Sequence, residues 1–189
     1  MRTSATRRPD GRHGGPHLVL HVQYAIGRRG LPAPATVRRW AAAALERDVA
    51  ATLRFVGAAE GTALNARYRG QDHATNVLTF VYDDVSPLAG DIVLCVPVVR
   101  REAKAGGKTL RAHCAHLVVH GMLHLQGHDH DAPREAARME ARETAILASL
   151  GVGDPYAMRA PGRGRSAARR SSRPAGAARS GAGAKAAGG

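Results

Sequence analysis

The chain has 189 residues and carries 28 lysines and arginines against 15 aspartates and glutamates, a formal net charge of +13. This length suits one domain with tails, and the charge favours a polyanionic partner such as nucleic acid. The longest apolar run, Ile92 to Val99, is much shorter than the ~20 residues of a membrane-spanning helix. Two cysteines, Cys95 and Cys114, are too few for a disulfide framework. These features predict a cytoplasmic protein with no membrane partner and with two thiols in its core.

The positive charge is concentrated at the two ends of the chain. Residues 159–189 contain eight basic residues and no acidic one, and residues 1–16 contain four basic residues and one acidic residue. Both segments lack the large apolar side chains that would offset the entropy of ordering them. We therefore expect disordered basic tails at 1–16 and 159–189, and one folded domain at 17–158 whose charges nearly balance.

The apolar pattern within 17–158 predicts nine elements. In chain order these are a strand at 18–22, a helix at 35–49, a strand at 52–56, a helix at 62–69, strands at 76–82 and 91–96, and helices at 98–105, 109–126 and 132–150. Gly70 and Gly127 are expected to end helices, and Asp131 is expected to cap the last one. Strands in the first half followed by helices indicate an α+β fold, although the order of the strands in the sheet does not follow from the pattern.

A cluster of histidines is the strongest functional feature of the sequence. His120 and His124 are one helical turn apart, so their imidazoles project from the same face of the predicted helix. Gly127 allows a sharp turn, after which His130 can fold back towards the first two. Three imidazoles with one open position are typical of a catalytic zinc site, and we predict that His120, His124 and His130 bind a metal ion. A histidine-rich, solvated helix end would give a similar pattern.

The spacing of these histidines also occurs in a large class of zinc proteases. In those enzymes a glutamate follows the first histidine and acts as the general base. Here that position is Gly121, which has no side chain that could move a proton. A zinc peptidase is therefore a weak alternative.

Three further residues each have two possible interpretations. His116, one turn before His120, could line the metal pocket or be a half-exposed helix histidine. Asp129 could orient a ligand imidazole or simply form a turn. Arg69, at the end of the predicted helix 62–69, could hold a phosphate through two parallel hydrogen bonds, or could complement the helix dipole.

Three segments carry a specific family resemblance. Residues 64–80 read LNARYRGQDHATNVLTF, residues 90–93 read GDIV, and residues 116–130 read HLVVHGMLHLQGHDH. In order and spacing these segments resemble the signatures of the YbeY family, the bacterial rRNA maturation factors that are single-strand-specific endoribonucleases. The resemblance spans about residues 17–155 and neither tail.

The resemblance implies a fold, a site and a function. It implies a compact domain in which a small mixed sheet packs against helices, with one zinc ion bound by His120, His124 and His130 and a functionally important Arg69. The implied activity is cleavage of single-stranded RNA in maturation of the 3′ end of 16S rRNA and in ribosome quality control. The implied partners are single-stranded rRNA, the small ribosomal subunit, ribosomal proteins or an assembly GTPase.

The sequence departs from the family pattern at two quoted positions. His128 stands where the family generally has tyrosine, and Ala74 stands where it often has proline. Neither position is a proposed ligand, although His128 adds a competing imidazole.

The sequence does not identify the general base, and it leaves two kinds of activity as alternatives. Asp91, at the start of a predicted strand, is a distant candidate for the base, and a structural role at the strand end is its alternative. A ribosome-assembly factor that binds zinc without cleaving RNA is the main alternative to an endoribonuclease. Structural zinc usually has four protein ligands, often cysteines, which three histidines without a nearby thiolate do not provide.

Overall fold

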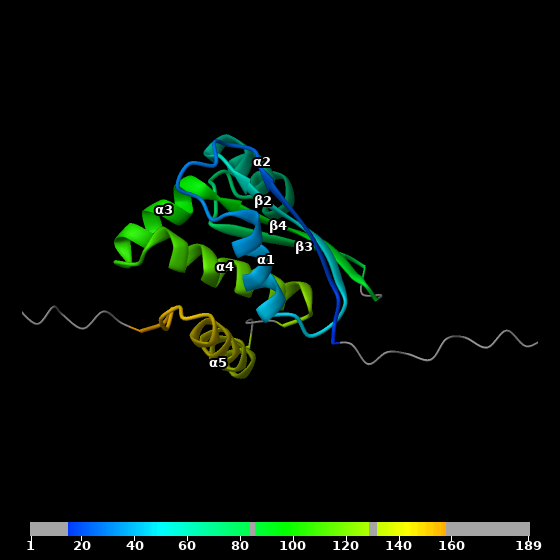
Figure 1. The fold of residues 1–189 in the computed structure, drawn as a ribbon. Helices are drawn as coiled ribbons and strands as arrows, with labels where there is room; N and C mark the ends of the chain where they lie inside the picture. Colours follow the sequence, from blue (N-terminus) through cyan, green and yellow to red (C-terminus); the bar gives the residue numbers. More distant parts are fainter. Residues whose placement is uncertain (1–14, 84–85, 129–131, 158–189) are drawn as a thin grey trace, which may run out of the picture. The chain divides into compact units, whose positions relative to one another are not determined.

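The computed structural model describes residues 15–83, 86–128 and 132–157. In these ranges the elements are β1 (Leu18–Tyr24), α1 (Pro34–Ala43), β2 (Val49–Val56), α2 (Ala58–Arg69), β3 (Val77–Asp83), β4 (Leu88–Cys95), α3 (Val96–Ala105), α4 (Leu110–Leu125) and α5 (Pro133–Ser149) (Figure 1). One four-stranded sheet and five helices confirm the predicted α+β class. The predicted disorder of the tails concerns residues that lie almost entirely outside the described ranges.

The sheet has the strand order β1-β2-β4-β3. β2 pairs with β1 and β4 in parallel, and β3 pairs with β4 in antiparallel fashion at one edge. The third and fourth strands are therefore neighbours, with a register irregularity between Val81 and Asp83. Because side chains of a strand alternate between the two faces, the register assigns each functional residue to a face.

The main core lies on the face of the sheet that carries Leu53, Phe55 and Ile92. Helices α1 and α4 cover this face, with Trp40 among their buried side chains (Figure 1). A smaller cluster on the opposite face packs under α2, and its buried members are Val56, Leu78, Val93, Cys95 and Val98. Both cysteines are free and buried, as predicted.

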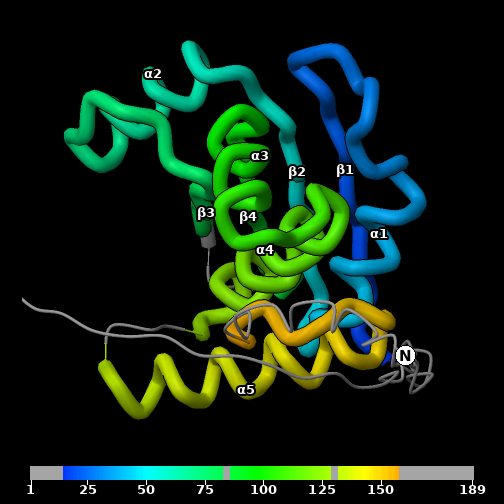
Figure 2. The backbone as a smooth tube through the Cα atoms, turned by 90° about the vertical axis from the view of Figure 1, so that its left-hand side faces the viewer, coloured from blue at the N-terminus to red at the C-terminus, as the bar shows by residue number. Residues whose placement is uncertain are grey.

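Helix α4 is the central helix of the domain. Ten of its residues are buried, among them Val118, Val119 and Met122, so it is enclosed on more sides than the single apolar face that its spacing predicts. Helix α5 packs against α4 and adds Met139 and Leu147 to the core (Figure 2). None of the helices in the described ranges has the length and apolarity that crossing a membrane requires.

Local signals begin and end several helices, and Gly70 and Gly127 act as the sequence predicts. Gly70 ends α2 with a φ of 69°, and Gly127 follows α4 with a φ of 89°. The Thr109 hydroxyl accepts a hydrogen bond from the Ala112 amide at 3.1 Å and caps α4. The N-cap of α5 is Ala132, which makes no side-chain capping bond, and the expected capping residue, Asp131, lies outside the described residues.

The predicted helix at 35–49 is too long at its C-terminal end. Helix α1 ends at Ala43, and Val49 begins β2 by pairing with Leu18 and Leu88. The buried Gln126 side chain stabilises the intervening turn, because its Oε1 accepts bonds from the Glu46 and Arg47 amides at 2.6 and 3.0 Å. This tertiary contact comes from the end of α4 and is invisible in the local pattern.

Candidate metal centre and active-site pocket

Helix α4 and the edge strand β3 form the two sides of a pocket of about 310 Å³. His120 and His124 line it from α4, and their ring centroids are 4.5 Å apart with an interplanar angle of 78°. The lining residues contributed by β3 and the loop before it are Thr75, Asn76, Val77, Thr79 and Val81. Val77, Thr79 and Val81 are opposite Leu94, Ile92 and Gly90 in the register, so they share the face that α4 covers.

Arg69 reaches the same pocket from the last turn of α2. The left-handed Gly70 turns the chain into a loop, which the buried Asn65 holds by donating to the His73 carbonyl at 2.6 Å. The loop then joins the sheet where the Cys95 amide donates to the Asn76 carbonyl at 2.9 Å. The structure thus brings Arg69, His120 and His124 to one pocket although they are widely separated in the sequence.

The remaining residues of the predicted cluster have different positions. His130 and Asp129 lie outside the described residues. His128 contacts Glu46, with Nε2 and Oε2 3.0 Å apart. The imidazole that departs from the family pattern is therefore engaged by the segment after α1.

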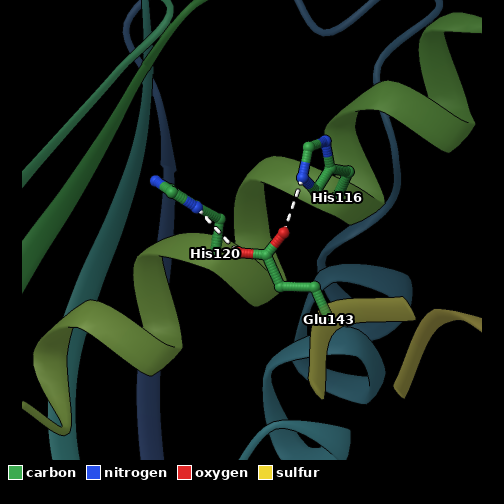
Figure 3. A group of neighbouring side chains, drawn as sticks. All are labelled: His116, His120 and Glu143. Atoms are coloured by element: carbon green, nitrogen blue, oxygen red, sulfur yellow. Dashed lines mark hydrogen bonds and ion pairs between the residues drawn. The ribbon is translucent and has the colours of Figure 1, made fainter. Parts of the chain in front are cut away.

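The other side of His120 faces a buried carboxylate on α5. Nδ1 of His120 donates to Glu143 Oε1 at 2.8 Å, and Nε2 of His116 donates to Glu143 Oε2 at 2.8 Å (Figure 3). The Tyr156 hydroxyl also donates to Oε2. Glu143 is fully buried, and these three donors use both of its oxygens.

These hydrogen bonds keep Glu143 ionised. Burial alone would raise the pKa of this carboxyl, but the bonds from His116, His120 and Tyr156 outweigh it and lower the pKa to about 2. Burial, together with the bond to the carboxylate, raises the pKa of Tyr156 well above its ordinary value. The tyrosine therefore stays a donor and the glutamate stays an acceptor at neutral pH.

His116 belongs to this second environment. Its ring packs against Tyr156 with a centroid separation of 5.4 Å, and its Nε2 faces Glu143. One possible ligand atom each from His116, His120 and Glu143 lies within 4.8 Å of the other two, so these three side chains are a second set that could hold a metal ion. The two candidate ligand sets share His120, and of the first set the structure describes His120 and His124.

Asp91 lies away from the histidine pocket. In the register it is opposite Phe80 and Thr52, on the face of the sheet that α4 does not cover. Its Oδ2 accepts a 2.5 Å hydrogen bond from the Tyr82 hydroxyl, a bond that raises the pKa of Tyr82 to about 12. This arrangement agrees with the structural alternative for Asp91.

Gly121 occupies the position where zinc proteases carry their catalytic glutamate. It is buried and faces the sheet, and a Cβ added there would lie 2.9 Å from Ile92 Cγ2. This position therefore points away from the pocket. The geometry gives a steric reason for the glycine and does not support the peptidase alternative.

The sequence patterns did not single out Glu143 or Tyr156. A signal for Glu143 was present, because Met139, Glu143 and Leu147 are spaced four residues apart and form the buried face of α5. A carboxylate in an apolar stripe needs polar partners. Tyr156 follows the last helix and had no comparable signal.

Comparisons with known proteins agree with the motif resemblance. Residues 35–151 match the family model described as "Endoribonuclease YbeY". An endoribonuclease YbeY from Aromatoleum aromaticum is 62% identical over 143 residues, which cover 74% of this chain and 93% of that relative. One from Thiobacillus denitrificans is 52% identical over 143 residues, covering 75% and 97%.

A solved structure is also similar. The solution structure of TM1509 from Thermotoga maritima matches with a TM-score of 0.46 and 22% identity, covering 70% of this chain and 92% of that one. The family match and the close relatives lead to one conclusion. This chain belongs to the YbeY family of endoribonucleases.

Proposed function

We propose that this endoribonuclease cleaves single-stranded RNA in the pocket between α4 and β3. In this proposal His120, His124 and His130 hold one zinc ion, and Arg69 binds the phosphate of the scissile bond. The observation that carries the proposal is the pocket itself, which is lined by Arg69 together with His120 and His124. A guanidinium beside two imidazoles suits a phosphodiester better than an uncharged substrate.

The chemistry of the donor set fits a zinc ion. Imidazole nitrogen is a preferred ligand of zinc, and a site with three histidines keeps a position open for catalysis. Zinc bound there would polarise a phosphate oxygen or lower the pKa of a bound water. Arg69 would neutralise the charge that develops on the phosphoryl oxygens.

We favour this ligand set over His116, His120 and Glu143 for a geometric reason. Both oxygens of Glu143 already accept hydrogen bonds. His116 and His120 each donate to one oxygen at 2.8 Å, and the Tyr156 hydroxyl is a third donor. Binding a metal with Glu143 would break these bonds in a buried site, at a cost for every donor left unpaired. His124 and Arg69, in contrast, lie on the pocket side of His120.

The wider role follows the family. We propose that the substrate is rRNA of the small ribosomal subunit near the 3′ end of 16S rRNA, met in the cytoplasm in company with ribosomal proteins or an assembly GTPase. The basic residues in 1–16 and 159–189 would add sequence-independent affinity for RNA. Deleting 159–189 should therefore weaken RNA binding mainly at low salt and reduce the slope of affinity against salt concentration.

Three alanine variants test the site. His124→Ala should lose both bound zinc and cleavage of single-stranded RNA, whereas Arg69→Ala should keep zinc and lose cleavage. His116→Ala should keep most of the zinc, because it removes a partner of Glu143 and no proposed ligand. Zinc is measured by metal analysis of the purified protein, and cleavage is measured on matched single-stranded and duplex RNA.

Arg67→Ala is the matched control for Arg69→Ala. Arg67 is an exposed arginine in the same last turn of α2 and does not line the pocket. Equal cleavage by Arg69→Ala and the parent would overturn the role of Arg69. Zinc retained by His124→Ala and lost by His116→Ala would favour the other ligand set. A zinc-loaded parent that binds ribosomal subunits and never cuts RNA would favour the assembly-factor alternative.

A further inference from the structure

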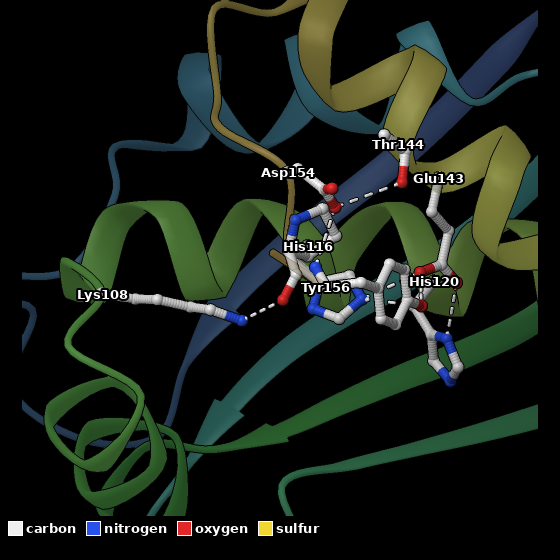
Figure 4. A network of polar contacts seen from close by, with 8 residues as sticks. Lys108, His116, His120, Glu143, Thr144, Asp154 and Tyr156 are labelled. Carbon is white, nitrogen blue, oxygen red and sulfur yellow. Dashed lines mark hydrogen bonds and ion pairs between the residues drawn. The ribbon is translucent and has the colours of Figure 1, made fainter. Parts of the chain in front are cut away.

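Glu143 connects His120 to the end of the described chain. The segment after α5 is attached at two points, because Lys108 Nζ donates to the Pro155 carbonyl and Thr144 Oγ1 donates to Asp154 Oδ1 at 3.5 Å (Figure 4). Within the segment, the Tyr156 amide donates to Asp154 Oδ1 at 2.8 Å. These bonds tie the segment to the loop before α4 and to α5. They place the Tyr156 hydroxyl against Glu143 Oε2.

The carboxylate is consequently held in one orientation. Oε2 receives Tyr156 and His116, which leaves Oε1 directed at Nδ1 of His120. Because an ionised carboxylate only accepts hydrogen bonds, Nδ1 of His120 has to carry the proton. The other ring nitrogen, Nε2, points away from Glu143 in Figure 3.

We infer that Glu143 is a positioning residue that fixes His120 in the Nδ1–H tautomer and so presents Nε2 as the nitrogen that binds the metal. The hydrogen bond at one ring nitrogen determines which nitrogen binds a metal, and it also fixes the plane of the ring. Tyr156 and His116 act on the site by holding Glu143. This inference rests on the proposed function, since His120 is taken as a ligand of the pocket metal.

The test uses the full chain with the isosteric change Glu143→Gln. The amide nitrogen of glutamine donates hydrogen bonds, so at least one of the three donors around residue 143 loses its acceptor. We expect the dissociation constant for Zn²⁺ to rise roughly 10- to 100-fold, the range seen when such a partner of a ligand histidine is changed. Competition with a chromophoric chelator measures this constant.

A second readout does not depend on zinc. Long-range ¹H–¹⁵N correlation spectra of the metal-free protein report which nitrogen of His120 carries the proton. We expect Nδ1–H in the parent and a mixture of tautomers in Glu143→Gln. Tyr156→Phe keeps the ring and removes only the hydroxyl. It should change the dissociation constant for Zn²⁺ and the tautomer of His120 in the same direction as Glu143→Gln, but by less.

Glu135→Gln is the matched control, because Glu135 is an exposed carboxylate in the first turn of α5. It should leave the tautomer and the zinc constant unchanged. An unchanged tautomer and zinc constant in both Glu143→Gln and Tyr156→Phe would overturn the inference. Failure of the proposed function would give a different result, because His124→Ala would then retain zinc. The tautomer of His120 would still show whether Glu143 fixes its proton on Nδ1.

Discussion

His120 separates two regions of the molecule that have opposite character. On the α5 side, the Glu143 side chain is 1% exposed and the His116 side chain is 16% exposed, and both oxygens of the carboxylate are bonded. On the pocket side, Arg69 is exposed and His124 is half-buried beside the open strand edge. The first region resembles a protein core, and the second resembles a binding surface.

The difference indicates that the α5 side of His120 has a structural role and that the pocket side has a ligand-binding role. The buried network stabilises the fold and holds one imidazole in place, because His116, His120 and Tyr156 all depend on Glu143 as their acceptor. The pocket presents polar side chains towards a ligand, and its exposed Arg69 is expected to contribute little to stability. Variants should therefore separate into those that unfold the protein and those that only remove function.

The largest effect is expected from Gly121→Glu, which introduces the residue that zinc proteases have at this position. The new side chain would meet Ile92 in the tightly packed contact between α4 and β4, and would bury a carboxylate without a cation. We expect the free energy of unfolding to fall by about 4 kcal/mol, measured by urea denaturation.

The same experiment has an internal control. Gly27→Glu places the same residue where a Cβ has open space, and it should change the free energy of unfolding by less than about 0.5 kcal/mol. A stable Gly121→Glu protein that gained peptidase activity would contradict the orientation of α4 described above.

The next largest effect is expected from Glu143→Leu. Leucine is similar in size to glutamate and leaves His116, His120 and Tyr156 without their shared acceptor. Because removing one partner from a buried charged network is costly, we expect a loss of about 3 kcal/mol in the metal-free protein. Glu140→Leu, on the exposed face of α5, should cost less than about 0.5 kcal/mol. Equal costs for the two variants would mean that the α5 side is no more core-like than the surface.

Zinc should stabilise the folded protein only in variants that keep both His120 and His124. A ligand at 100 times its dissociation constant stabilises the folded state by about 2.7 kcal/mol, provided that it does not bind the unfolded chain. We expect this gain in the parent and little gain in His124→Ala, measured as the shift in the urea midpoint on adding zinc. The gain should survive in His116→Ala, and its loss there would place the metal on the α5 side of His120.

The two regions also differ in how far the sequence predicts them. The spacing of His120, His124 and Gly127 is local, and the structure has the expected helix and the expected turn. The sequence left open whether Arg69 binds a phosphate near the histidines or complements the helix dipole, because α2 and α4 are far apart in the chain. The partners of Glu143 come from α4 and from residue 156, so their meeting depends on how α5 docks.

The errors at element ends have the same origin. Helix α1 stops early because Gln126, about 80 residues away in the chain, bonds the backbone of the turn that follows it. Strand order could not be derived, because the β1-β2-β4-β3 order depends on non-local pairing. Local periodicity therefore predicts most of the elements and the turn at Gly127. The buried polar contacts that hold them together need the fold.

The smallest effect is expected from Arg69→Ala. Arg69 is exposed and lines the pocket, so its removal in the metal-free protein should change the free energy of unfolding by less than about 0.5 kcal/mol. Cleavage should nevertheless be lost, because one donor to a developing oxyanion is worth roughly 100- to 1,000-fold in rate. Urea denaturation and cleavage rates measured on the same preparation give both numbers. A loss of activity in proportion to a loss of stability would mean that Arg69 supports the fold, and the two sides of His120 would then no longer differ.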